Sequence, residues 1–426
     1  MRKIIACFLL VFCLTLPAAV WGDTPPGGAA PEGAPSAPGL APPLTLLAPP
    51  TDPENFAFLY FGDIQVVESS EADYTAWGEL AASAVRRHPG VAFALQGGDI
   101  AESGIDRGQW DAFFAAAAAL GDLAFFPTIG NHESNFPGGK PELYLELFDL
   151  PAGGPEGFNE EFYSFDYGNI HVVSLNSWVF SGEQKLTEAD FRRVDDWLAA
   201  DLAASDATWK IAFTHVPLLA VHSDTTAIKT REHWEGIFQK YGVDLCFVGH
   251  QHVYSRLRPL TGGVVDYEDG ITYIMGNSGQ KFYSSADETL AERTIYNIAT
   301  YQLARVSGDA LTVQTFDIDG NELDYVELSP RETALTRAEF VEALWRAAGE
   351  PAGGAGEAGV TGAASGAGAA TYPYKDVAPG NEAVAWAYER GYMVGYGGGL
   401  FGPDDRMSKG QIASVRGRMT RDSLIF

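Results

Sequence analysis

Six side chains with metal-binding chemistry follow five short apolar segments of this chain. Aspartate, asparagine and histidine supply the oxygen and nitrogen atoms that bind Zn, Mn and Fe in mixed sites. One such residue after one apolar segment is an ordinary turn, but the same arrangement after five segments is hard to ascribe to chance. The six residues are Asp63, Asp99, Asn131, His215, His250 and His252.

The last of these segments carries two histidines, one residue apart. The apolar run 243–248 ends at Gly249, and His250 and His252 follow it. If this is the extended end of a strand, side chains at i and i+2 point the same way. Because histidine is the commonest metal ligand, two imidazoles that face one spot indicate a metal. The alternative is a loop with two solvated histidines.

A set of carboxylates and imidazoles of this size is enough for two metal ions, with an aspartate bridging them. Two ions a few ångströms apart stabilise an in-line displacement at phosphorus and lower the pKa of a bound water molecule. The leaving alkoxide then needs a proton, which a histidine beside the site can donate. The chemistry that this set predicts is therefore hydrolysis of a phosphate ester by activated water.

The segments that must position these residues alternate between strand-like and helix-like patterns. Such alternation indicates α/β architecture, and in an open α/β sheet a site lies beyond the carboxyl ends of the strands. We therefore expect the six side chains to meet at one edge. The strand-like runs are 56–61, 91–95, 124–129, 170–175, 209–214 and 243–248, and the helix-like runs are 74–87, 110–120 and 187–203.

Between residues 270 and 328 the pattern contains strands alone. The runs are 271–275, 301–306, 310–317 and 322–328, with turn signals between the last three. This pattern predicts an antiparallel sheet that completes a two-sheet core.

The ligand motifs resemble those of the metallophosphoesterase superfamily, the calcineurin-like phosphoesterases. The resemblance covers residues 56–328, and the runs 249–256 and 162–176 are most similar to the purple-acid-phosphatase-like branch. It implies a four-layer αββα sandwich, with two mixed β-sheets flanked by helices. It also implies two divalent or mixed-valence metal ions (Fe, Mn or Zn) and a phosphate-ester substrate.

The resemblance also implies a role for each motif residue. Asp63 and His252 bind one metal, and Asp99 bridges both metals and is catalytic. His132, the residue after the asparagine, contacts the phosphate or protonates the leaving group. The residues implied for the second metal are Asn131, His215 and His250.

Two positions depart from the family pattern, and two further residues are candidates for the substrate. Gln65 stands where the broad family often has histidine, so it is a weak oxygen ligand or lines the pocket. Glu102 stands where purple acid phosphatases have tyrosine, so a purple Fe(III) centre is not implied. His222 reaches the substrate or is a loop histidine, and Arg256 touches phosphate or forms a surface salt bridge.

The N-terminal region has the pattern of an exported protein. Residues 1–22 combine Arg2 and Lys3 with an apolar run and small residues, which predicts a signal peptide. Residues 23–53 are rich in Pro, Gly and Ala and predict a linker to a catalytic domain at 54–330. No later stretch is long and apolar enough to span a membrane. Cys246 lies in an apolar strand and is expected to be a small buried hydrophobe.

The chain is strongly acidic, with a formal net charge of −28 at pH 7. Nearly all of this charge lies in residues 23–330, which argues against nucleic acid as a partner of that region. Residues 331–426 predict a separate small helical module, with a Gly/Ala-rich insertion at 349–371.

The C-terminal module resembles S-layer homology repeats, on the motifs at 335–340, 374–377, 383–395 and 400–405. One half and one full repeat are visible. The resemblance implies binding to cell-wall polysaccharide, and hence a secreted protein of the bacterial cell envelope.

The sequence thus predicts a secreted, metal-dependent phosphomonoesterase. One alternative is a phosphodiesterase that acts on nucleotide or glycerophosphodiester substrates at the same site. Another, of a different class, is a wall-binding envelope protein whose phosphatase domain is degenerate through Gln65.

Overall fold

The computed structural model describes residues 47–66, 73–134, 138–330, 335–351, 373–396 and 399–405, with Met407, Ile412, Val415, Arg418 and Met419. All of these belong to one compact unit, Pro42–Phe426. The predicted signal peptide, most of the linker and most of the Gly/Ala-rich insertion lie outside the described residues.

A six-stranded sheet joins the first strands of the chain to the last. Its order is β15-β14-β13-β1-β2-β3, and its strands are β1 (Asn55–Phe61), β2 (Phe93–Gln96), β3 (Ala124–Pro127), β13 (Tyr301–Ser307), β14 (Ala310–Phe316) and β15 (Glu322–Leu328). β1, β2 and β3 are parallel, and β13 pairs antiparallel with β1. β14 pairs antiparallel with both β13 and β15, so the antiparallel prediction for the last three runs is confirmed.

A seven-stranded sheet has the order β12-β8-β11-β7-β6-β5-β4. Its strands are β4 (Tyr163–Tyr167), β5 (Ile170–Leu175), β6 (Trp209–Thr214), β7 (Leu245–Val248), β8 (Tyr254–Leu257), β11 (Thr272–Met275) and β12 (Ala291–Ile295), and a separate ribbon pairs β9 (Leu260–Thr261) with β10 (Val264–Val265). In this sheet β11 pairs parallel with β7 and antiparallel with β8, so its predicted place in one antiparallel sheet with the last three runs is wrong. Parallel neighbours need a long crossover, and here β8, β9 and β10 supply it without a helix.

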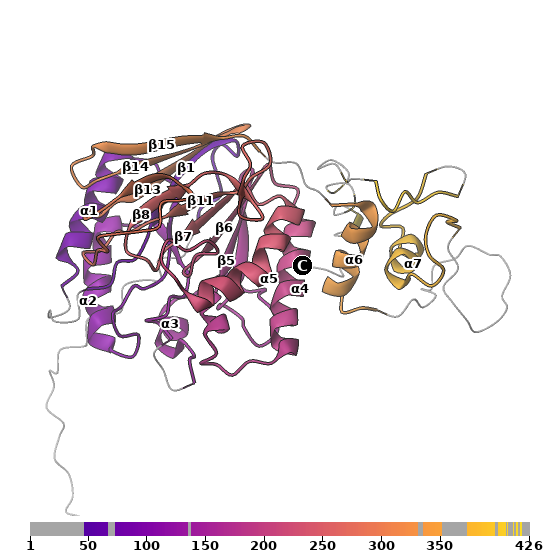
Figure 1. Ribbon diagram of the computed structural model, residues 1–426, viewed down its shortest axis with the longest axis horizontal. Coiled ribbons are helices and arrows are strands. Elements are labelled where there is room, and N and C mark those ends of the chain that lie inside the picture. The colour runs from indigo at the N-terminus through magenta and orange to yellow at the C-terminus, as the bar shows by residue number, and fades with distance from the viewer. Residues whose placement is uncertain are drawn as a thin grey trace, which may run out of the picture. The chain divides into compact units, whose positions relative to one another are not determined.

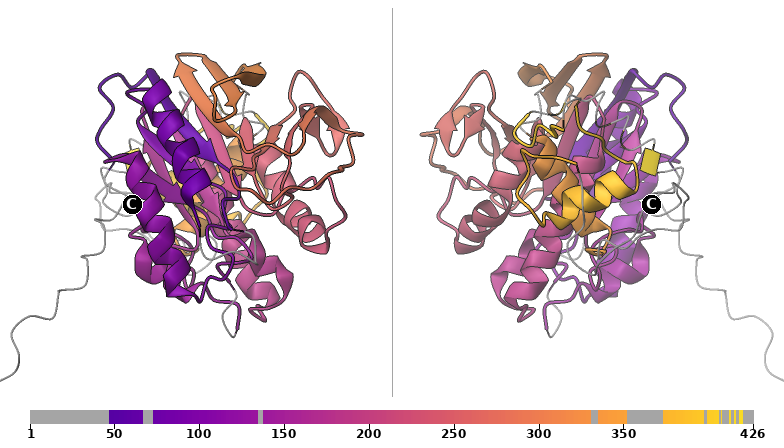
Figure 2. Two further views of the ribbon diagram at one scale, coloured as in Figure 1. Left: turned by 90° about the vertical axis from the view of Figure 1, so that its left-hand side faces the viewer. Right: turned by 90° about the vertical axis from the view of Figure 1, so that its right-hand side faces the viewer.

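Helices cover the outer faces of both sheets. Those on the sheets (Figure 1) are α1 (Thr75–Arg87), α2 (Arg107–Ala117), α4 (Glu188–Ala204) and α5 (Thr225–Tyr241). The chain also forms α3 (Glu142–Leu147) between β3 and β4, 3-10 turns at Ala118–Leu120 and Ser177–Ser181, and α6 (Arg337–Ala347) and α7 (Glu382–Glu389) in the C-terminal region. In Figures 1 and 2, α1 and α2 lie on one side of the paired sheets and α4 and α5 on the other. This is the predicted four-layer arrangement.

The residues of β7 show why the layers stack in this order. Leu245 and Phe247 face the core between the sheets, whereas Cys246 and Val248 face the core under α4 and α5. Across the sheets, the ring of Phe247 stacks on that of Tyr60 in β1, with centroids 4.3 Å apart. A parallel strand buried on both faces must be apolar at every position, which accounts for the unbroken run and for the buried, free Cys246.

A buried histidine at the start of β5 makes the stability of this fold depend on pH. Nδ1 of His171 lies 2.8 Å from Oδ1 of Asp166, and Nε2 lies 2.9 Å from Oδ2 of Asp201. Burial lowers the pKa of His171, but Asp201 and Asp166 outweigh burial and raise the pKa to about 9. Because the folded-state pKa exceeds the unfolded value near 6.5, the protonated histidine stabilises the fold fully below pH 6.5. This contribution is lost as the pH rises through 9.

We expect His171→Gln to destabilise the protein by up to about 3 kcal/mol at pH 6 and by much less at pH 9.5. Urea unfolding of the wild type and of His171→Gln at pH 6 and pH 9.5 measures the difference in their free energies of unfolding. Groups that titrate alike in both proteins do not contribute to this difference. A destabilisation of the same size at both pH values would show that His171 acts through packing alone.

The first motif of the C-terminal region is tied to the segment after α7. Thr336 begins α6 with a capping box. The guanidinium of Arg337 donates to the carbonyls of Phe401 and Val394, 2.8 and 2.7 Å away, and lies over the ring of Tyr396. These contacts join the half repeat, which begins at residue 335, to the full repeat that follows it, so the two form one module. The sequence pattern also predicts a last helix at 409–419, and this segment lies largely outside the described residues. No helix in the described part of the chain is long and apolar enough to cross a membrane.

Candidate metal centre

The six predicted ligands meet where the carboxyl ends of strands from both sheets come together. Asp63, Asp99 and Asn131 follow β1, β2 and β3 of the six-stranded sheet, and the three histidines follow β6 and β7 of the other sheet. The expectation of one edge of one sheet is therefore wrong. The two sheets approach so closely here that a Cβ on Gly62 would lie 2.1 Å from the carbonyl oxygen of Gly276.

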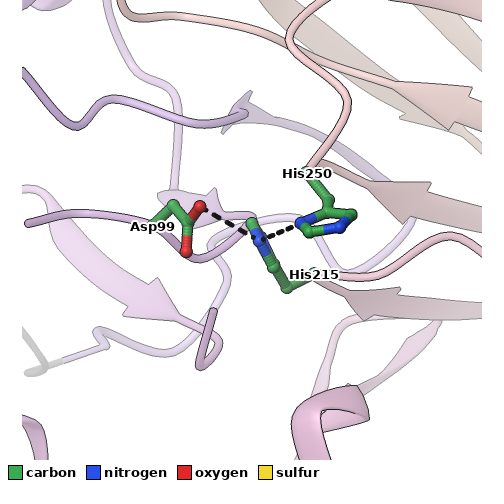
Figure 3. Close-up of side chains that lie close together, drawn as sticks. All are labelled: Asp99, His215 and His250. Carbon is green, nitrogen blue, oxygen red and sulfur yellow. Dashed lines mark hydrogen bonds and ion pairs between the residues drawn. The ribbon is translucent and has the colours of Figure 1, made fainter. Parts of the chain in front are cut away.

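The side chains form two groups of potential metal ligands that share one carboxylate. In each group the ligand atoms lie within 4.8 Å of one another: Asp99, His215 and His250 form the first, and Asp63, Asp99 and His252 the second. Figure 3 shows the first group, in which Nε2 of His215 lies 3.2 Å from Asp99 Oδ2 and 3.1 Å from His250 Nδ1. In the second group His252 Nδ1 lies 3.2 Å from Asp63 Oδ2.

Three further predicted residues border these groups. Oδ1 of Asn131 lies 3.1 Å from Nε2 of His215. Gln65 donates from Nε2 to Oδ2 of Asp99 at 3.1 Å. His132 lies with Nε2 3.8 Å from Asp99 Oδ2, and its backbone N–H donates to Asp99 Oδ1. The structure thus brings Gln65 and His132 to the shared carboxylate and Asn131 to the neighbouring His215.

Three of the ligands stand on left-handed backbone. The φ angles of Asp99, His250 and His252 are +55°, +74° and +45°, a conformation that costs on the order of 1–3 kcal/mol for such residues. The two histidines are therefore not on an extended strand end, and that expectation is wrong. Instead each one turns to a different ligand group. Gly249 permits the close approach of Asp63 to this loop, because a Cβ there would lie 2.2 Å from Oδ1 of Asp63.

Burial and neighbouring charge set the protonation of the groups. Burial raises the pKa of Asp63 to about 7 and lowers that of His252 to about 3. Burial also opposes ionisation of Asp99, but His215 and His132 hold its pKa well below the ordinary value. Burial lowers the pKa of His215, but Asp99 outweighs it and raises the pKa to about 9. His252 is thus in the neutral form that binds metals, with Asp99 ionised beside it.

The residues present fit a metal centre. Among the buried polar atoms of the described residues that lack a hydrogen-bond partner, three lie at this centre: Asp63 Oδ2, Gln65 Oε1 and His252 Nδ1. Such atoms are costly to leave unsatisfied. A cation bound between them would satisfy carboxylate, amide and imidazole atoms together, and these are donors that Zn, Mn and Fe accept.

One buried carboxylate that the sequence analysis did not select holds two ligand loops together. Glu133 is fully buried and accepts backbone N–H groups from both loops. Its Oε2 accepts from Asp99 and Gly130, both at 2.8 Å, and its Oε1 accepts from Ile100 at 2.8 Å and Ala101 at 3.2 Å. In the sequence, Glu133 directly follows His132, and this position was the signal that could have identified it.

A second such carboxylate orients a histidine. Oδ2 of Asp224 lies 2.8 Å from Nε2 of His250, whose Nδ1 faces His215. This arrangement fixes the ring and leaves Nδ1 free to bind a metal. The bond to His250 also lowers the pKa of Asp224 to about 2. Asp224 is at the same time the N-cap of α5. From the sequence alone, Asp224 is indistinguishable from any other helix N-cap residue, so its contact with His250 could not be predicted.

Replacing Asp224 by Asn separates these two roles, because asparagine caps helices as well as aspartate does but carries no charge. We expect Asp224→Asn to weaken metal affinity by roughly 10- to 100-fold with little change in stability. Competition with a chelator measures the affinity. The control is Asp106→Asn, which changes the N-cap of α2, where the carboxylate accepts from Gly108 and not from a histidine. Equal effects of the two changes would exclude the orienting role.

The two candidates for the substrate have different surroundings. The ring of His222 packs edge-on against Tyr283, and Tyr283 packs in the same way against His252, with centroids 5.1 and 5.0 Å apart. His222 is therefore beside the centre. Arg256 donates to both oxygens of Asp324 at 2.7 and 3.0 Å. The ion pair, which the sequence left open as the alternative to phosphate contact, is what the structure contains.

Comparison with known families agrees with this geometry. Residues 56–254 match the calcineurin-like phosphoesterase model. The chain contains a calcineurin-like phosphoesterase domain. Residues 373–413 match the S-layer homology domain, so the chain also contains such a domain after its phosphoesterase domain.

Proteins similar to the phosphoesterase domain include acid phosphatases. Over 161 residues, 29% of this chain and 26% of the relative, the domain is 29% identical to an acid phosphatase of Aspergillus ficuum. Over 181 residues, 40% of this chain and 38% of the relative, it is 29% identical to purple acid phosphatase 23 of Arabidopsis thaliana. The chain thus spans about a quarter to two fifths of the length of these relatives.

Among solved structures, a purple acid phosphatase from yellow lupin (Lupinus luteus) seeds matches 69% of this chain and 56% of its own. The TM-score is 0.53 and the sequence identity 20%. This likeness concerns the fold, and it agrees with the two mixed sheets and their flanking helices.

Proposed function

We propose that the phosphoesterase domain hydrolyses phosphate monoesters with two metal ions in the centre described above. The observation that carries this proposal is the shared Asp99, which belongs to two groups of ligand atoms at once. An aspartate between two sites is what a two-metal centre requires. When bound, the ions would activate water and stabilise charge on a phosphoryl group during in-line displacement.

The side chains around the centre supply the rest of the chemistry. Nδ1 of His132 contacts the backbone carbonyl of Glu102, which leaves Nε2 facing the centre. Burial lowers the pKa of His132, but Asp99 outweighs it and raises the pKa. The imidazolium is thereby kept as a proton donor for the leaving oxygen. The ions would be held by Asp63, His252, Asn131, His215 and His250, with Gln65 as a further ligand or a neighbour of one ion.

The experiment that tests this proposal compares an aryl phosphate monoester with the matching diester. Purified protein is stripped by a chelator and then given Mn, Zn or Fe in turn. Metal-dependent release of phosphate from the monoester is expected, and the most active metal identifies the working ion. Preferential cleavage of the diester would make the protein a phosphodiesterase. Tight metal binding without turnover would mean that the domain has become a binding module.

We further propose that the protein is exported by its N-terminal signal and held at the bacterial cell wall by its S-layer homology domain. A chain that ends at Pro330 is expected to keep phosphatase activity and to lose sedimentation with purified cell walls. The full-length chain with Asp99→Asn is the control, because it keeps the wall-binding region and lacks activity. Equal sedimentation of the truncated and full-length chains would contradict attachment through residues 331–426.

A further inference from the structure

A large cavity lies beside the metal centre, at the N-terminal end of α5. Its volume is about 750 Å³, and its walls are the loop at 218–224, the first turns of α5, and Leu257, Asp287 and Leu290. This volume is within the range of sites for small molecules. None of the roles described so far makes use of it.

The loop that forms one wall is fastened to the metal-binding residues. Gln251 stands between the two ligands of the Gly-His-Gln-His motif, and its Oε1 accepts the backbone N–H groups of Val221 and His222 at 2.7 and 3.0 Å. Its Nε2 donates back to the carbonyl of His222. On the other side, the N–H of Asp287 donates to the carbonyl of Val221 at 2.8 Å. Hydrogen bonds therefore attach this wall of the cavity to the motif that carries His250 and His252.

Two lining residues connect the cavity to both ligand groups. Asp224 lines the cavity and bonds to His250 of the first group. His222 also lines it, and its ring contacts Tyr283, which in turn contacts His252 of the second group. A substrate whose phosphoryl group lies at the centre therefore has this cavity within reach of its remaining part.

The lining indicates the chemistry of that part. Apolar side chains from Leu219, Val221, Ile228, Leu257 and Leu290 provide the surface for an alkyl or aryl group. Ile228 is 56% exposed, so a bound apolar group would remove it from water. The charges in the lining are mostly acidic, and the cation Arg231 is paired with Glu235 at 2.9 Å.

We propose that this cavity, the alcohol pocket, receives the neutral or cationic, largely apolar alcohol portion of a phosphate monoester during hydrolysis. Its acidic groups disfavour substrates with a second phosphate, because like charges repel. This inference rests on the proposed function and specifies its substrate class. The reaction that consumes the substrate breaks one P–O bond, adds water, and releases inorganic phosphate and the alcohol.

The first test is binding of the alcohol alone, which needs neither metal nor turnover. A fluorinated octanol is titrated into the metal-stripped full-length protein and followed by ¹⁹F NMR. We expect saturable binding that Ile228→Asp weakens roughly three- to tenfold, since the change places a charge at an apolar contact. Ile228 is exposed on α5, so the substitution does not threaten the core. Ile318→Asp is the matched control, because Ile318 is 40% exposed in the turn between β14 and β15.

The second test compares methyl, butyl and octyl phosphate as substrates of the metal-loaded protein, with phosphate release as the readout. Each buried methylene favours binding up to about fourfold, so kcat/KM for octyl phosphate is expected to exceed that for methyl phosphate by more than about tenfold. Ile228→Asp is expected to reduce this ratio, and Ile318→Asp to leave it at the wild-type value.

The outcomes separate the inference from the proposed function. Turnover of all three esters at one rate, or a ratio unchanged by Ile228→Asp, would overturn the alcohol pocket and leave the phosphatase intact. Faster cleavage of an alkyl bisphosphate than of the monophosphate would overturn the charge argument. Octanol binding without release of phosphate from any ester would overturn the proposed function instead.

Discussion

Asp99→Asn is expected to lower kcat/KM for phosphate-ester hydrolysis by about a thousandfold or more, with the fold retained. Asp99 is shared by both groups of ligand atoms, so removing its charge weakens both metal sites at once. Metal ions contribute several kcal/mol to catalysis of this kind, and each 1.36 kcal/mol is tenfold in rate. Hydrolysis of an aryl phosphate and metal analysis of the purified variant measure the two effects.

Asparagine is the appropriate replacement because residue 99 has a φ of +55°, and asparagine adopts this conformation more readily than most residues. Loss of activity through unfolding is thereby made improbable, and circular dichroism checks it. Asp111→Asn on the exposed face of α2 is the matched control, with activity expected at the wild-type level. A folded Asp99→Asn variant with full activity and two bound ions would rule out the shared-ligand assignment.

The meeting of the six candidate side chains could be predicted from sequence because each one lies within a few residues of the end of a buried apolar strand. The strand brings its last residue to a common end of the fold, and the chemistry of Asp and His is local. What could not be predicted is which sheet each strand joins. His215 and His250 follow strands of the seven-stranded sheet, and nothing in the runs before them differs from those of the six-stranded sheet.

Contacts between distant parts of the chain account for the other omissions. Glu133 and Asp224 act through groups that the fold brings to them, the N–H groups after β2 and the imidazole of His250. Likewise, β12 has no fully buried residue, so its sequence has no apolar alternation to detect. The pairing of β12 with β8 decides its structure, and such pairing is a tertiary effect.

Glu133→Gln is expected to destabilise the protein by roughly 2–5 kcal/mol and to reduce metal binding with it. Each carboxylate oxygen of Glu133 accepts two backbone N–H groups. In glutamine one oxygen becomes an NH₂ group, which has only donors to offer. Two buried N–H groups of the ligand loops would then face another donor. The loop after β2 carries Asp99, so its displacement moves the shared ligand. Urea unfolding and metal titration measure the two effects.

Glu161→Gln provides a control of equal size and burial, since Glu161 is 3% exposed. Its partners, the side-chain amides of Asn176 and Gln184, both donate to Oε2, so a glutamine can place its oxygen there and keep both bonds. At Glu133 both oxygens accept backbone N–H groups, so Glu133→Gln should cost clearly more than Glu161→Gln and should alone weaken metal binding. If both variants lost the same stability and kept full metal affinity, Glu133 would be an ordinary buried acid. The ligand loops would then hold their shape without it.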